Sequence, residues 1–181
     1  MTGLFRLGRE SRGSVLVEFA VVVPLMVLLF FGVYEGTRAV RARMNVTSGA
    51  EAYANMIAMR GALTAAQLAI YCDGAKLAMY PFDASSFKAA VSSVTKNAVG
   101  TVAEDWHDAT CGSAAAISSP ASVATSPTNM IPNSGDSVII VRVTYTYASP
   151  IHVVLPGSMT FTQTVFARPR NNASITCITC T

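Results

Sequence analysis

An apolar run of twenty residues, from Val15 to Tyr34, constrains this chain more than any other feature. Glu18 is the only charged residue in the run. Twenty residues in an α-helix span about 30 Å, which is the thickness of the hydrocarbon core of a bilayer. An acid inside such a run costs about 2.5–3.5 kcal/mol at mid-bilayer and less near the edge, so it indicates a functional site. The run therefore predicts a membrane helix, and Glu18 predicts a partner for its charge.

The two small residues Gly13 and Ser14 stand directly before the run, after a leader that carries three arginines. A secretory signal peptide has a shorter apolar core, and its small-residue cleavage site follows that core. No Ala-x-Ala pattern follows this run. A cut between Gly13 and Ser14 would instead remove residues 1–13 and leave the membrane helix on the mature protein. The alternative is an uncleaved signal anchor in which Glu18 reaches toward the interface.

Charge does not orient the predicted span, because each flank carries three arginines against one glutamate, a net charge of +2. Four cysteines all follow the run: Cys72, Cys111, Cys177 and Cys180. An even number in a small exported domain suggests two disulfides, with three possible connectivities, and disulfides persist in an oxidising compartment. We therefore place residues 1–13 in the cytoplasm and the chain after about Tyr34 outside it. Four reduced cysteines in a cytoplasmic domain are the alternative.

The composition fits a membrane-anchored protein, with 51% apolar and 13% charged residues. The formal net charge is only +3, and no basic run is present that would follow a phosphate backbone, which argues against nucleic-acid binding. The length of 181 residues suffices for one membrane helix and one domain of roughly 100–130 residues.

The helical pattern extends beyond the apolar run. Small or apolar residues recur every three or four positions at Val40, Met44, Thr47, Ala50, Ala54, Ile57 and Gly61. This period predicts one helix over residues 14–61, with its membrane-spanning part at about 15–34. Pro24 lies inside the span, where it deletes a backbone hydrogen bond and predicts a kink.

The remaining residues, 62–181, predict a small α+β domain. A capping box at Thr64 and Gln67 predicts a second helix over 65–79, and Asp83 is expected to cap a third helix over 84–97. Strands are predicted over 99–110, 137–147 and 158–168, with a long loop over 112–135. The expected fold class is thus α+β: a long N-terminal helix, then short helices and a small antiparallel sheet.

The N-terminal segment resembles a known family. Gly13 followed by a small residue, with Glu18 fifth and Phe19 sixth after the bond, resembles the recognition site of prepilin peptidases. Residues 12–20, with Pro24-Leu25, Gly32, Glu35 and Arg38, resemble the signature of TadE-like proteins over about residues 13–49. These are minor pilins or pseudopilins of tight-adherence (Flp-type) pili. A TadF-like identity is the nearest alternative.

The resemblance implies a pilin-like structural subunit of the bacterial inner membrane, with a cytoplasmic N-terminus and a periplasmic domain, that also reaches the extracellular pilus. It implies cleavage by a prepilin peptidase, and it implies that Glu18 neutralises the freed amino group of Ser14 on an adjacent subunit. The implied partners are a TadF-like minor pilin, the major Flp-type pilin and the inner-membrane assembly platform. The implied task is to initiate or cap a pilus used in surface adhesion.

Two chemical alternatives come from the cysteines and histidines. Cys177 and Cys180 have redox-motif spacing, but no helix follows them, so a structural disulfide is favoured, with Cys72–Cys111 as its companion. His107 and His152 lack the ligand spacing of a zinc site. We therefore expect no catalytic residues, metal or cofactor; the alternatives are a signal-anchored periplasmic binding module and a thiol-disulfide oxidoreductase.

Overall fold

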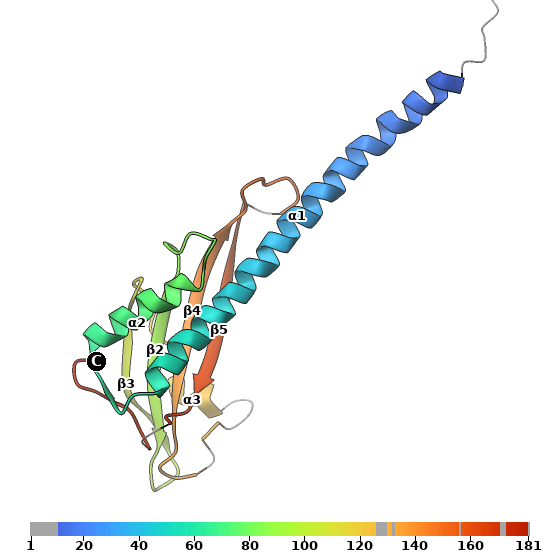
Figure 1. The fold of residues 1–181 in the computed structure, drawn as a ribbon. Helices are drawn as coiled ribbons and strands as arrows, with labels where there is room; N and C mark the ends of the chain where they lie inside the picture. Colours follow the sequence, from blue (N-terminus) through green and yellow to red (C-terminus); the bar gives the residue numbers. More distant parts are fainter. Residues whose placement is uncertain (1–10, 126–129, 132, 156, 171–172, 181) are drawn as a thin grey trace, which may run out of the picture.

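The computed structural model describes residues 11–125, 130–131, 133–155, 157–170 and 173–180, with the backbone alone at residues 11–14. In chain order its elements are α1 (Ser11–Ala58), β1 (Ala62–Leu63), α2 (Ala65–Leu77), β2 (Lys88–Lys96), β3 (Val102–Cys111), α3 (Pro120–Thr125), β4 (Ser137–Ala148), β5 (Ser158–Ala167) and β6 (Thr176–Cys177). A long helix followed by short helices and an antiparallel sheet confirms the predicted α+β class (Figure 1).

The helix α1 has 48 residues and is therefore about 72 Å long. Its two ends lie three residues before the predicted ones, and it continues through Pro24 without a break. Its first half extends away from the rest of the molecule, whereas its second half packs against α2, β4 and β5 (Figure 1). The kink expected at Pro24 stays a prediction.

The main sheet has the strand order β3-β2-β4-β5, and every neighbouring pair is antiparallel. One face carries α1 and α2, whose Tyr53 and Leu68 share a buried core with Val91 and Val141. The opposite face is covered by α3 and the chain around it in a second core, which contains Ala90, Val94, Ile131 and Ile140. The central strand β2 is consequently buried on both faces.

The helix predicted over residues 84–97 is wrong, because Lys88–Lys96 forms β2. Phe87, Val91 and Val94 are spaced like the apolar positions of a helix. Because both faces of β2 are covered, its sequence lacks the alternation of apolar and polar residues that identifies a half-exposed strand. Asp83 does not cap a helix. It accepts hydrogen bonds from the backbone N–H and the hydroxyl of Ser85, which is an Asx-type turn.

The other predicted elements are confirmed to within a few residues. The capping box of α2 is present: Thr64 accepts a hydrogen bond from the backbone N–H of Gln67, and the Gln67 side chain accepts one from the N–H of Thr64. Strands β3, β4 and β5 correspond to the three predicted strands, and the predicted loop over 112–135 contains the short helix α3. The parallel pair β1–β6, which brings the C-terminal segment to the α1–α2 connection, was not predicted.

The residues of α1 that are buried against the domain are only partly those predicted from the recurring small and apolar positions. Ala50, Ala54 and Ile57 are buried as predicted, but Val40 and Met44 are 60% and 65% exposed. The residues that face the domain are mostly small and include Glu35: Glu35, Ala39, Ala42, Val46, Gly49, Ala50, Tyr53 and Ile57. Between residues 39 and 50 the buried positions are mostly alanine or glycine, and these small residues let the helix axis approach the domain closely.

Candidate functional site

The apolar first half of α1 is exposed along its whole length. Representative side chains such as Leu16, Phe19, Leu25 and Phe30 are exposed by 60% or more. This is the one helix in the described part of the chain that is long and apolar enough to cross a membrane. No residue in its most apolar stretch is buried. The domain therefore leaves most of the predicted span uncovered and contacts only its last turn, at Gly32.

The predicted processing residues lie at the free end of this span. The backbone of Gly13 and Ser14 forms the first turn of α1, and residues 1–10 of the predicted leader lie outside the described residues. Glu18 and Phe19 are exposed, and among the described side chains Glu18 has no hydrogen-bond or ion-pair partner. Within the described part of the chain, no polar partner is thus provided for the Glu18 carboxylate.

A second acid of α1, Glu35, lies directly after the apolar run and is completely buried. Its Oε1 accepts a hydrogen bond from the backbone N–H of Val153 at 2.9 Å. Its Oε2 accepts from the N–H groups of Val154 at 3.1 Å and Leu155 at 2.8 Å. These bonds, led by that from Leu155, lower the pKa of the Glu35 carboxyl below its ordinary value because they favour the ionised form.

The three N–H groups belong to the loop between β4 and β5, residues 149–157, which we call the β4–β5 loop. This loop lies beside α1 at the end of the sheet that faces the free half of the helix (Figure 1). Val154 continues the contact toward the span, because its Cγ2 is 3.6 Å from the position that a Cβ on Gly32 would occupy. Glu35 therefore fixes the loop against the last turn of the apolar run.

Arg38, one turn further along α1, makes a second contact with the domain. Its guanidinium lies 5.4 Å from the ring centre of Phe82 and 5.8 Å from that of Tyr34, and it donates a hydrogen bond to the Tyr34 hydroxyl at 3.1 Å. That hydrogen bond raises the pKa of Arg38. Phe82 precedes β2, whereas Glu35 binds the β4–β5 loop. Two distant segments of the domain are therefore held to the turn of α1 that directly follows the span.

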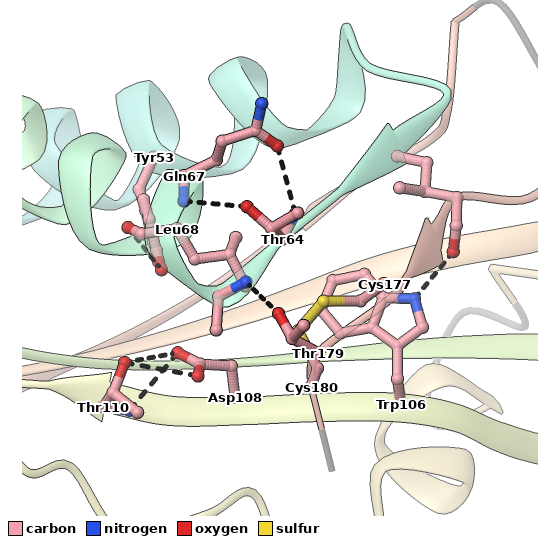
Figure 2. The surroundings of a disulfide bond; sticks show 12 residues. Tyr53, Thr64, Gln67, Leu68, Trp106, Asp108, Thr110, Cys177, Thr179 and Cys180 are labelled. Atoms are coloured by element: carbon pink, nitrogen blue, oxygen red, sulfur yellow. Dashed lines mark hydrogen bonds between the residues drawn. A yellow bond between two sulfur atoms is a disulfide. The ribbon is translucent and has the colours of Figure 1, made fainter.

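All four cysteines form disulfides, Cys72–Cys111 and Cys177–Cys180. The first joins α2 to the end of β3. The second lies in the C-terminal segment beside Trp106, whose indole N–H donates to the Ile175 carbonyl at 2.6 Å (Figure 2). Thr179, between the two C-terminal cysteines, accepts a hydrogen bond from the N–H of Ala65 at the start of α2 (Figure 2).

Neither Cys177 nor Cys180 belongs to a described helix, whereas the oxidoreductase alternative would put its reactive thiol in the first turn of one. Cys177 belongs to β6, and the pair closes the end of the core near Trp106. Among the described residues, no three His, Cys, Asp or Glu side chains come together in a group that could hold a metal ion.

The sequence did not predict the structural role of Glu35. It was counted among the charges that flank the span and among the residues that resemble the TadE-like signature. Its partners are 118 to 120 residues away, so no local pattern marks them. The position of Glu35 on the face that continues through Ala39, Ala42 and Val46 was the available signal.

Comparison with known proteins agrees with the resemblance of the N-terminal segment. The model of the family described as TadE-like protein matches residues 13–55. No curated protein and no solved structure matches the chain. The matched segment contains Gly13, Glu18, Glu35 and Arg38, and it ends within the part of α1 that packs on the sheet. Residues 13–55 of the chain are thus similar to the family described as TadE-like protein, and the match covers the helix α1 alone.

Proposed function

We propose that this chain is a minor pilin or pseudopilin of the tight-adherence pilus, made as a precursor in the bacterial inner membrane. The observation that supports this most is the position of the TadE-like segment. It starts at the small residues before an uncovered apolar span and continues into the helix that forms the core of the domain. Such a chain is built to offer one half of its helix to a membrane or to other helices.

The first step proposed is cleavage between Gly13 and Ser14 by a prepilin peptidase on the cytoplasmic face. Glycine permits the close backbone approach that a protease needs. The bond lies near the start of the described part of α1. Removal of residues 1–13 leaves Ser14 as a free amino terminus at the head of the span.

The second step proposed is pairing between Glu18 and the new amino terminus of a neighbouring subunit. An α-amino group has an ordinary pKa of about 7.7–8.0, so the Ser14 amine is largely cationic at neutral pH. Glu18 is exposed on the span, and pairing removes much of the cost of an acid in an apolar environment. The acid thus acts as an assembly device that the precursor cannot use.

In this proposal the domain after residue 61 lies in the periplasm, where the two disulfides persist. The mature helix packs against the major Flp-type pilin and a TadF-like minor pilin, with assembly driven from the inner-membrane platform. The exposed side chains of Val40 and Met44 lie about two and about three helical turns beyond the span and add apolar surface to this part of α1. The subunit starts or caps a fibre used for adhesion and performs no catalysis itself.

Processing is tested by expressing the full chain with and without a prepilin peptidase, followed by intact-mass measurement and N-terminal sequencing. We expect a new terminus at Ser14 only with the peptidase, and the same spectrum reports any methylation of that amine. Gly13→Ile is the matched control and should remain uncut. A terminus that stays at Met1, or one that maps after Tyr34, would refute the proposal and favour a signal-anchored binding module.

The assembly role of Glu18 has a separate test. Glu18→Ala should still be cut but should give few pili by electron microscopy, because the neighbouring amino terminus then lacks its partner. Wild-type pilus numbers in this variant would contradict the intersubunit role and leave the processing step intact.

A further inference from the structure

The β4–β5 loop is an apolar loop that lies beside the end of the span and has exposed valine side chains. Its sequence, Ser-Pro-Ile-His-Val-Val-Leu-Pro-Gly over residues 149–157, has no Asp, Glu, Lys or Arg. Val153 is 55% exposed and Val154 is 49% exposed. The two valines therefore place a small exposed apolar surface next to the apolar run of α1.

The position of the loop along α1 is fixed by two contacts. Glu35, the first residue after the apolar run, binds three consecutive N–H groups of the loop. Val154 packs over Gly32, which lies two residues before the end of the run. Because the rise per residue is about 1.5 Å, the valines stand within about one helical turn of the end of the span. If the span lies in a bilayer, the loop lies at its surface.

The hydrogen bonds to Glu35 also make this loop suited to an apolar surface. An irregular loop is normally excluded from lipid because its backbone N–H groups would lose their water partners. Here three consecutive N–H groups are already bound by one carboxylate. Tyr34, which precedes Glu35 in α1, is the type of aromatic residue that favours the membrane interface. The loop can therefore expose valine side chains to lipid without leaving these donors unpaired.

We propose that the β4–β5 loop is a second membrane contact. Val153 and Val154 insert into the boundary between headgroups and acyl chains, next to the last turn of the α1 span. This inference rests on the proposed membrane anchoring of α1. Together the span and the loop give the domain two points of attachment, which fix its height and its tilt over the bilayer before the subunit enters a fibre.

The test places an environment-sensitive fluorophore on a single introduced cysteine in the full chain, reconstituted in phosphatidylcholine–phosphatidylglycerol vesicles. All four native cysteines are disulfide-bonded, so only the new thiol reacts under non-reducing conditions. The three sites are Val153→Cys in the loop, Leu25→Cys in the span, and Val99→Cys. Val99 is 89% exposed and lies between β2 and β3, at the opposite end of the sheet. Circular dichroism confirms that each labelled protein is folded.

We expect the Val153 probe to be quenched by lipids with a nitroxide near the headgroup and to be several-fold less accessible to aqueous iodide than the Val99 probe. The Leu25 probe should be quenched by lipids with a deep nitroxide. If Val153 is as accessible as Val99 while Leu25 is quenched by lipid, the loop proposal is overturned and the membrane span stands. If Val153 is protected from iodide without lipid quenching, protein covers the loop and the proposal is also overturned. If Leu25 is itself accessible to iodide, the span and the loop contact fail together.

Discussion

Replacing Cys72 and Cys111 together by alanine removes the disulfide that joins α2 to the end of β3. The matched control replaces Cys177 and Cys180, which removes the other disulfide and the same number of sulfur atoms. Both variants keep the span, the sheet and the helix caps. Their comparison isolates how each crosslink stabilises the domain.

Loop-closure entropy predicts unequal losses. In the chain-entropy model, a separation of 39 residues gives about 4 kcal/mol at 25 °C, and a separation of 3 residues gives about 1.6 kcal/mol. Burial increases the difference, because Cys72 and Cys111 are buried whereas Cys177 and Cys180 are half-buried. A domain of this size is stabilised by about 5–15 kcal/mol in total, so the loss of the first disulfide removes a large share.

Urea unfolding of the full chain in mild detergent measures both losses. The chain has one tryptophan, Trp106, which is buried in the domain, so its emission reports the domain and is insensitive to the detergent-bound span. Because Trp106 lies near the C-terminal disulfide, far-UV circular dichroism serves as the second probe (Figure 2). Equal losses within about 0.5 kcal/mol, or a larger loss for the Cys177–Cys180 variant, would refute the entropic reasoning.

Three further substitutions test single interactions. Glu35→Gln replaces one acceptor oxygen by a donor, so amide hydrogen exchange of the β4–β5 loop should accelerate at pH 7 while β4 stays protected. Unchanged protection of the loop would show that the hydrogen bonds from the loop to Glu35 do not hold it in place. In the wild type the pKa of Glu35 lies below its ordinary value of 4.5, so the stabilisation from the ionised carboxylate is fully present above pH 4.5. It is lost as the pH falls through the lowered folded-state pKa, and protection of the loop should decrease only in that acidic range. Thr64→Ala should cost about 1 kcal/mol in urea unfolding because α2 loses its N-cap, and no loss would show that the cap is redundant. Trp106→Phe should cost about 1–3 kcal/mol by circular dichroism because the Ile175 carbonyl loses its donor, whereas a neutral effect would mean that water replaces the indole.

The elements that sequence predicts well are those that depend on near neighbours in the chain. The start of α2 is set by Thr64 and Gln67, three residues apart, and the second half of β4 alternates because only one of its faces is covered. The prediction for β2 is wrong for the opposite reason. The burial of its second face depends on residues distant in the chain, among them Ile117, Ala124 and Ile131. The prediction of which α1 residues are buried is wrong for a similar reason. Val40 and Met44 are more apolar than Ala39 and Ala42, but the domain packs against the two small residues and leaves the larger ones exposed.

The two acids of α1 show most directly what sequence cannot decide. Glu18 and Glu35 are separated by 17 residues, about 25 Å along one helix, and both stand at an edge of the apolar run. From sequence alone Glu18 is the conspicuous residue, because it interrupts the run, and Glu35 is one flanking charge among several. In the folded chain Glu35 is completely buried and its carboxylate accepts three backbone hydrogen bonds, while Glu18 is exposed. An acid that the fold satisfies can fix the domain to the helix, but it has no free charge to offer a neighbour. Only Glu18 retains that capacity, and this is why the assembly proposal rests on Glu18 and the membrane-contact proposal on Glu35.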